Sequence, residues 1–314
     1  FKLHNPYIER TDDFFYPIIV TKDKNERFIG QFQRIPCKYY INGEVFDAFW
    51  GMDYIVDEAS RGSSAGVYLA KQALKDYHFG MGLSPISFKL HLILGEKHIG
   101  NYYKYIQFKS LFCLLKFAIS IITKHSISTQ SSSSYYPDII NIGDVSFQKK
   151  SDPSDINWEA DNNNYIEFSR DKEFLSWRFG TYPKIFTAYT YENESGTKAY
   201  FIIRNVIWKG FPFLLLVDYR YRENALQPML KAVRKILKKT HNYGIITLSS
   251  FSDIDKALKH NGYLKFGSSG QIVTNVVINI PNQRIEQRKS IFVTLADSDA
   301  DFFYGNNEWY EYEL

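Results

Sequence analysis

The sequence predicts a mixed α/β fold in two tandem domains, each a twisted mixed sheet flanked by helices. Three observations support this prediction. The chain has 314 residues, which is enough for two domains of ordinary size. Strand-like and helix-like segments follow one another in the same order in both halves. A stretch rich in Ser, Asn and Asp separates the halves, so we expect an N-terminal domain at 1–125, a linker at 126–164 and a C-terminal domain at 165–314.

The first half contains the clearest local pattern, in which a long strand runs through a loop of small residues into a helix. The predicted order is strands over 16–56, a helix over 67–74, a second helix opened by Ser84-Pro85 and closed by Gly95, and strands over 99–108. The second half repeats this order with a helix at 174–179, strands at 185–191, 199–206 and 211–218, a long helix at 225–239, a strand at 244–248 and a helix at 253–260.

Composition and charge exclude several classes of function. Hydrophobic residues make up 45% of the chain and charged residues 23%, as in an ordinary well-cored protein. The net charge of +4 is a mild excess spread along the chain, so we expect no nucleic-acid partner, although an anionic cofactor would suit it. No run of about 18 uncharged apolar residues occurs, so we expect no membrane span.

The cysteines and the N-terminus point to a cytoplasmic protein. The two cysteines, Cys37 and Cys113, lie in unrelated contexts without any Cys/His cluster, so neither a disulfide framework nor a metal site is expected. A reducing compartment is the default for such a chain, and the first residues lack the pattern of a signal peptide.

The loop before the first helix has the chemistry of an anion site. The first N–H groups of a helix lack intrahelical partners, and the helix dipole favours anions there. Small side chains let the backbone approach a phosphate closely, and Arg61 adds a permanent positive charge. We therefore predict a diphosphate site in this loop, formed by Arg61, Gly62, Ser63, Ser64, Ala65 and Gly66.

The loop resembles that of the GNAT superfamily of acyl-CoA-dependent N-acyltransferases. In that family an Arg/Gln-x-x-Gly-x-Gly/Ala loop cradles the CoA pyrophosphate ahead of a long helix. This chain has Arg61-Gly62-Ser63-Ser64-Ala65-Gly66, with Ser64 where the family usually has glycine. The resemblance implies acetyl-CoA or another acyl-CoA as co-substrate, with the pantetheine held by the backbone of Tyr54, Ile55 and Val56.

Two residues are candidates for catalysis. Asp53 is an acidic residue inside an otherwise apolar run, where burial would make it a better base for the acceptor amine. The family often places a tyrosine four residues before a helix-ending glycine to protonate the thiolate. Counting back from Gly95 gives His91, which implies that His91 serves as this proton donor. For both residues a purely structural role is the alternative.

The second half resembles the same family more faintly. The segment Phe174–Phe179 followed by Tyr182-Pro183, and the ending Thr294–Asp299, are similar to GNAT-like proteins found among bacterial surface-polysaccharide genes. Its loop at 218–224 contains no glycine, so we expect a degenerate cofactor site there. The polysaccharide resemblance implies a primary amine acceptor such as an amino sugar or a nucleotide sugar.

The same sequence features are compatible with two other functions. One is a non-catalytic GNAT-like binding or scaffold protein, because Ser64 and the missing tyrosine depart from the family pattern. The other is an aminoacyl-tRNA-dependent transferase of the peptidoglycan-bridge type, which also has twinned GNAT-like halves.

Overall fold

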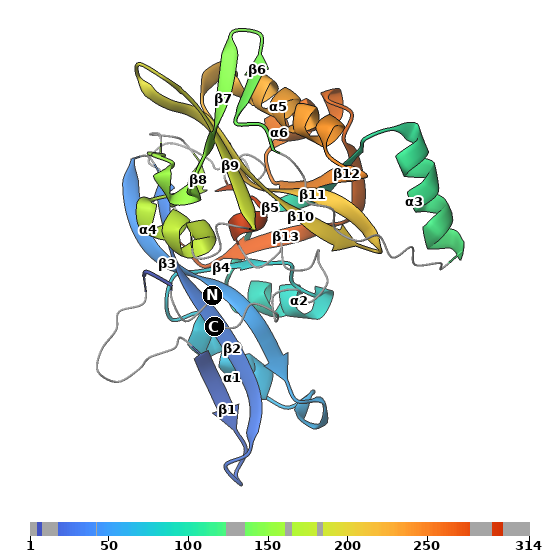
Figure 1. The fold of residues 1–314 in the computed structure, drawn as a ribbon. Coiled ribbons are helices and arrows are strands. Elements are labelled where there is room, and N and C mark those ends of the chain that lie inside the picture. Colours follow the sequence, from blue (N-terminus) through green and yellow to red (C-terminus); the bar gives the residue numbers. More distant parts are fainter. Residues whose placement is uncertain are drawn as a thin grey trace. The chain divides into compact units, whose positions relative to one another are not determined.

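The computed structural model describes residues 5–7, 18–41, 43–123, 136–160, 165–180, 185–276 and 291–297. These residues form two compact units (Figure 1). Unit 1 contains the described residues within 1–102, 160–170 and 269–292, and unit 2 contains those within 103–159, 171–268 and 293–297. Within the described residues, no helix is both long and apolar enough to cross a bilayer.

Unit 1 is built on one mixed sheet in the order β14-β8-β2-β3-β4-β13, with β1 added beside β2. Its core is formed where α1 buries Leu69, Ala70 and Ala73 against β2. The elements of the unit are β1 (Ile18–Lys22), β2 (Phe28–Ile41), β3 (Glu44–Val56), η2 (Glu58–Ser60), α1 (Ala65–Ala73), β4 (His78–Met81), α2 (Pro85–Ile93), β8 (Ile166–Phe168), β14 (Ile291–Phe292), the first residues of β5 (Lys97–Phe108) and the last residues of β13 (Leu264–Thr274).

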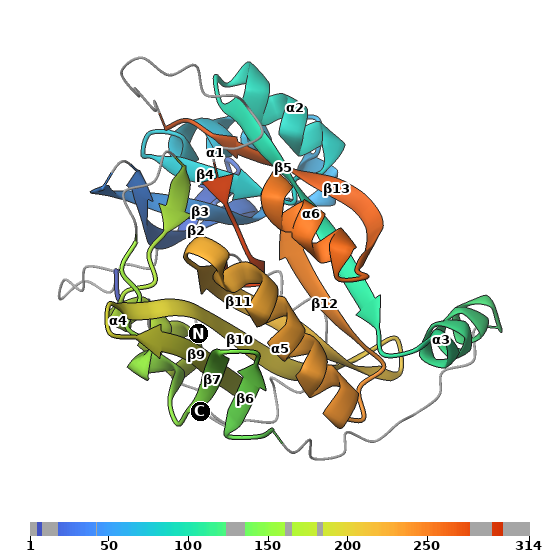
Figure 2. The same cartoon turned by 90° about the horizontal axis from the view of Figure 1, so that it is seen from above.

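Unit 2 contains the sheet β5-β12-β11-β10-β9-β7-β6. Figure 2 shows α5 beside β6 and packed on the face of β10 and β11. The remaining residues of β5 and β13 belong to this unit, together with α3 (Leu111–Thr123), β6 (Ile139–Ile142), β7 (Val145–Lys150), η3 (Pro153–Asp155), α4 (Lys172–Leu175), η4 (Ser176–Gly180), β9 (Phe186–Asn193), β10 (Gly196–Trp208), β11 (Phe211–Tyr221), η5 (Glu223–Ala225), α5 (Leu226–Lys239), β12 (Gly244–Ser249), α6 (Ser252–His260) and η6 (Leu295–Asp297).

The same order of elements occurs twice along the chain. The first run is β2-β3-α1-β4-α2-β5, and the second is β10-β11-α5-β12-α6-β13. In each run two antiparallel strands are followed by a helix and by a strand parallel to the second of them. The last strand of each run pairs with a strand of the other run. In unit 1, β13 of the second run is antiparallel to β4 of the first, and in unit 2, β5 of the first run is antiparallel to β12 of the second.

This exchange of strands explains why the units differ from the sequence-continuous division predicted at 1–125 and 165–314. Each unit takes in a strand from the other half, so compactness does not follow chain order. The predicted linker at 126–164 also differs from the structure. Residues 139–150 of that stretch form the antiparallel pair β6 and β7, and β7 pairs with β9. Residues 124–135 and 161–164 lie outside the described residues.

Candidate functional site

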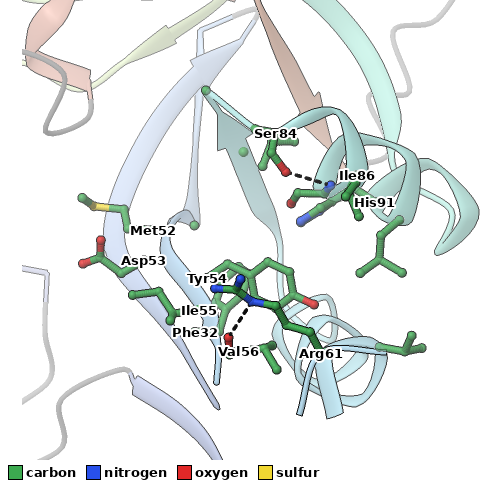
Figure 3. Close-up of a pocket in the computed structure, with 18 of the residues that line it drawn as sticks. Phe32, Met52, Asp53, Tyr54, Ile55, Val56, Arg61, Ser84, Ile86 and His91 are labelled. Atoms are coloured by element: carbon green, nitrogen blue, oxygen red, sulfur yellow. Dashed lines mark hydrogen bonds between the residues drawn. The ribbon is translucent and has the colours of Figure 1, made fainter. Parts of the chain in front are cut away.

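Unit 1 contains a cavity of about 830 Å³ at the point where two parallel strands separate (Figure 3). Strands β3 and β4 are paired over Phe49–Gly51 and His78–Gly80. Beyond these residues both strands continue along the cavity, with Met52–Val56 on one side and Met81 on the other. The start of α1 and one face of α2 complete the wall. Its volume lies in the range of small-molecule and cofactor sites.

The loop from Arg61 to Ser64 is exposed, and α1 begins directly after it. The Ser63 hydroxyl accepts a hydrogen bond from the Ala65 N–H at 3.2 Å. In the part of the chain that the structure describes, the next two N–H groups, of Gly66 and Val67, have no hydrogen-bond acceptor. The start of α1 therefore presents free donors beside the cavity, as an anion site requires.

Backbone conformation explains the composition of this loop at two positions. Gly62 has a φ of 91°, which favours glycine. A Cβ atom on Gly66 would lie 2.7 Å from the Tyr54 hydroxyl oxygen, so a side chain there would displace the tyrosine. Ser64 has a φ of −71°, in the right-handed helical region, so serine in place of the family's glycine introduces no backbone strain.

Arg61 is available for a ligand. Its side chain is 67% exposed, with a long contact of 3.9 Å to Glu58. Its Nε donates to the Val56 carbonyl oxygen at 3.4 Å, and Figure 3 shows this contact as a dashed line. Both contacts are weak, so the guanidinium retains most of its hydrogen-bonding capacity.

Asp53 lies at an irregularity in β3. Gln31 and Gln33 of β2 pair with Ile55 and Met52, so Asp53 and its neighbour Tyr54 face the single residue between the two glutamines. The φ of Asp53 is 44°, in the left-handed region, which identifies a β-bulge. The predicted burial of Asp53 is wrong, because its side chain is exposed. In Figure 3 its carboxylate points away from Arg61 and His91, so as placed it aims at neither of the groups proposed to hold the donor.

The three residues predicted to hold a pantetheine follow the bulge and line the cavity. Tyr54 and Val56 are half-buried, and Ile55 is 52% exposed. The backbones of Ile55 and Val56 pair with Gln31 and Gly30 of β2 on one side. The pairing of β3 with β4 ends before them, so the other edge of β3 faces the cavity.

The predicted proton donor, His91, lies on α2 and lines the cavity together with His78 from β4. Both side chains are buried, and their rings are stacked with centroids 5.7 Å apart. Glu96 connects them. Its Oε1 lies 2.6 Å from the Nδ1 of His78, and its Oε2 is hydrogen-bonded to the Nδ1 of His91. Among the described residues, the Nε2 of each ring has no hydrogen-bond partner.

The charge state of Glu96 follows from these two bonds. Burial alone would raise the pKa of its carboxyl group. The hydrogen bonds from His78 and His91, and the charge of these rings, outweigh burial, so the pKa of Glu96 is lowered. Glu96 is therefore a carboxylate near neutral pH, and it accepts hydrogen bonds from both histidines.

His78, His91 and Glu96 are also residue types that can bind a metal ion. Their ligand-type atoms lie within 4.8 Å of one another. Two ligands about 2.1 Å from one tetrahedral zinc ion would be about 3.4 Å apart. The distance of 2.6 Å between His78 Nδ1 and Glu96 Oε1 is instead that of a direct hydrogen bond. The Nδ1 atoms of His78 and His91 are therefore hydrogen-bonded to Glu96 and are not spaced as ligands that share one metal ion with this carboxylate.

Sequence reasoning brought His91 to the cavity but missed His78 and Glu96. His78 lies in a strand of four residues, which shows little periodicity. Glu96 directly follows the glycine that ends α2, where an acidic residue usually faces water. The spacing of His91 and Glu96 could have indicated their contact. They are separated by about one helical turn and a glycine, so both side chains can lie on the same side of α2.

The corresponding strand end in unit 2 is filled with polar side chains. Asp218 of β11 is fully buried and accepts hydrogen bonds from the hydroxyl groups of Tyr200 at 2.8 Å and Thr294 at 2.7 Å. Arg220 lies 3.2 Å from Asp218 and 4.0 Å from Asp297. Asp297 belongs to η6, which packs against β11. The polar groups at this strand end therefore bond within the protein.

No family model and no curated protein sequence matches this chain. Many solved structures resemble it, among them the following two. A GCN5-related N-acetyltransferase from Anabaena variabilis has a TM-score of 0.51 and 12% identity, covering 82% of this chain and 62% of its own. A protein from Enterococcus faecalis described as a probable N-acyltransferase has a TM-score of 0.52 and 12% identity, covering 79% of this chain and 59% of its own. The chain thus spans about three fifths of each of these proteins.

The likeness confirms the fold that the loop motif predicted. The chain has the mixed α/β GNAT fold, and the predicted helices at 67–74 and after Ser84-Pro85 correspond to α1 and α2. Two pieces of the fainter resemblance, Tyr182-Pro183 and Ser298-Asp299, lie outside the described residues.

Proposed function

We propose that this chain is an acyl-CoA-dependent N-acyltransferase, with acetyl-CoA as donor and a primary amine as acceptor. The observation that carries the proposal is the cavity between β3 and β4, which has free helix N–H groups and an exposed arginine at one end and buried histidines along its wall. A long ligand with an anionic head and a reactive tail fits this distribution of charge.

The diphosphate of the donor would bind at the start of α1. The N–H groups of Gly66 and Val67 would donate to its oxygens, and Arg61 would pair with its charge. The pantetheine arm would run along the free edge of β3 at Tyr54, Ile55 and Val56, where backbone groups supply its hydrogen bonds. The thioester would then lie toward the point where β3 and β4 separate.

The chemistry is a direct transfer from sulfur to nitrogen. The neutral amine attacks the thioester carbonyl carbon, the C–N bond forms and the C–S bond breaks. The departing thiolate takes a proton from His91, which lines the cavity. The amine loses one proton to a base, and Asp53 remains a candidate for this base if its carboxylate turns toward the cavity. Neither Cys37 nor Cys113 lines the cavity, so the transfer uses no thiol of the protein.

Unit 2 would have a structural role and would not bind a second acyl-CoA. Its counterpart of the cavity end is filled by the Asp218–Arg220 cluster, and the η5 turn that follows β11 contains no glycine. We propose a cytoplasmic enzyme of two GNAT-like repeats acting in polysaccharide biosynthesis, with an amino sugar or nucleotide sugar as the first acceptors to test. This acceptor class rests on the motif resemblance in the second half.

Calorimetric titration with acetyl-CoA tests the proposal. We expect binding that Arg61→Glu weakens at least tenfold, because the charge at the diphosphate is reversed. Arg234→Glu is the matched control, since Arg234 is an exposed arginine of α5 in unit 2 and should bind acetyl-CoA like the wild type. Free-thiol release with a panel of amines then identifies the acceptor. Absence of binding would overturn the proposal, and binding without transfer to any amine would favour a scaffold protein.

A further inference from the structure

We propose, on the basis of the acyltransferase function above, that His78, Glu96 and His91 form one catalytic unit in which His78 accepts the proton of the amine and His91 donates a proton to the CoA thiolate.

The hydrogen bonds of Glu96 determine which ring nitrogens can exchange protons. A carboxylate only accepts hydrogen bonds, so the Nδ1 of His78 and that of His91 must each carry a hydrogen. This assigns the tautomer of both rings and leaves Nε2 as the exchangeable position. Both Nε2 atoms are buried without a partner in the described chain, on side chains that line the cavity. An unpartnered buried polar atom is unfavourable, and a group bound in the cavity would relieve it.

The net charge of the cluster favours the state in which only one of the two histidine rings is protonated. With Glu96 ionised, two neutral rings would leave a net charge of −1 in a buried site, and two protonated rings would leave +1. One neutral ring and one imidazolium give a neutral cluster, which avoids the cost of an uncompensated buried charge. In this state one Nε2 is an empty acceptor and the other is a loaded donor, as amide formation from a thioester requires.

The proposed step is balanced in protons and electrons. The nitrogen lone pair of the amine forms the C–N bond, and the electrons of the C–S bond leave with sulfur. The amine proton moves to the empty Nε2 of His78, and the proton on Nε2 of the His91 imidazolium moves to the thiolate. The products are the amide and CoA thiol, with the positive charge transferred from His91 to His78. Exchange with water then restores the starting state.

The position of His78 agrees with its role. His78 begins β4, two residues before the pairing with β3 ends at Gly80. A Cβ atom on Gly51 would lie 2.1 Å from the Nε2 of His78, so this nitrogen occupies the space beside the Gly51 backbone that a side chain would otherwise fill. Besides Glu96, a titratable side chain that packs on this pair of rings in the described part of the chain is Tyr54, whose ring lies 6.3 Å from that of His91. Burial raises the pKa of Tyr54, so it remains a neutral hydroxyl group.

Nitrogen NMR of protein isotopically labelled at both histidine and glycine tests the unit in the wild type. We expect both rings to carry a hydrogen on Nδ1, and acetyl-CoA to shift the Nε2 resonances of His78 and His91 but not that of the exposed His260. The backbone amides of Gly62 and Gly66 report separately on the diphosphate site. If these amides shift while neither histidine Nε2 responds, the catalytic unit is overturned, whereas the donor binding on which the proposed function depends is supported. If nothing shifts, the proposed function itself fails.

Kinetics provide the second test, with acetyl-CoA and glucosamine as the probe pair. His78→Asn and His91→Asn keep a donor near Glu96 but remove Nε2, so each should lower kcat roughly 10²-fold with little change in KM for acetyl-CoA. The double variant should lose no more than the larger single loss, because the two rings act as one unit. His98→Asn, a histidine of β5 outside the cavity lining, is the control.

The pH profile separates catalysis from folding. We expect the wild-type kcat to be bell-shaped in pH, with His78→Asn removing the limb that reports the base. A merely structural role would leave the shape of the profile unchanged. The inference is overturned if Asp53→Asn abolishes turnover while His78→Asn does not, or if a chelator removes the activity and zinc restores it.

Discussion

The ends of β3 and β11 are built by the same order of elements but differ in what occupies them. Each strand is followed by a short turn and a helix, and each has a parallel neighbour on one side. The end of β3 opens into a cavity of about 830 Å³ with unpartnered histidine nitrogens. The end of β11 is filled by Asp218, which is bonded to both Arg220 and Thr294. The secondary-structure order thus provides a position for a site, and the side chains decide whether it is open.

The two ends also place their charge differently. Arg61 is exposed at the entrance of the cavity with weak contacts, so removing it should affect a ligand more than the fold. Arg220 is buried against Asp218, so removing either partner should affect the fold more than a ligand. Substitutions at the two ends can therefore test whether the assignment of an open and a filled site is correct.

The largest effect is expected from Asp218→Asn. Asparagine keeps the shape but leaves Arg220 buried beside a neutral side chain, which costs about 3–5 kcal/mol of unfolding free energy. Urea denaturation measures this loss, and acetyl-CoA binding to the folded protein should stay within twofold of the wild type. Asp253→Asn, an exposed aspartate of α6, should change stability little. If Asp218→Asn is as stable as the wild type, the cluster is not what fills this end.

A smaller effect is expected from Glu96→Gln. The amide oxygen can accept one hydrogen bond, but the amide nitrogen cannot accept the second, so one buried Nδ1–H of His78 or His91 loses its partner at a cost of about 1–3 kcal/mol. This loss concerns unit 1, so it should be accompanied by a loss of transfer activity.

The effect of Glu96→Gln on stability should depend on pH. The pKa of Glu96 is lowered in the folded protein from its ordinary value of 4.5. Its contribution is therefore complete above that value and is lost as pH falls through the lower folded pKa. The difference in unfolding free energy between wild type and Glu96→Gln should be largest near pH 7 and shrink below pH 4.5. A difference that stays constant or grows as the pH falls would contradict the charge assigned to Glu96.

The sequence predicted the parts of this comparison that depend on local signals. The amphipathic helix α5, the start of α2 at Ser84-Pro85 and the exposed loop before α1 all follow from residues close together in the chain. Their side-chain periodicity, caps and glycines act over one or two turns, so neighbouring residues suffice to predict them.

The parts that were missed depend on contacts between distant residues. A strand bulge is one structural alternative for Asp53, but the sequence could not decide for it, because the bulge arises from the register of β3 against β2 and register is not visible in one strand alone. His78 meets Glu96 only because β4 and the residues after α2 are brought together by the fold. The exchange of β5 and β13 between the two runs is likewise a property of pairing, so chain order alone suggested continuous domains.

The smallest effect on stability is expected from Gly66→Ala. This substitution also tests directly whether the loop before α1 binds acetyl-CoA. The new Cβ atom would lie 2.7 Å from the Tyr54 hydroxyl oxygen, the far end of a side chain that can shift, so the cost in unfolding free energy should be about 1 kcal/mol. The shifted tyrosine would enter the cavity beside the helix N–H groups, and acetyl-CoA affinity measured by calorimetry should fall about tenfold. Tyr54→Phe removes the clashing oxygen, so the double variant should recover most of the affinity. If Gly66→Ala binds like the wild type, close approach of this backbone to an anion is not what holds the donor.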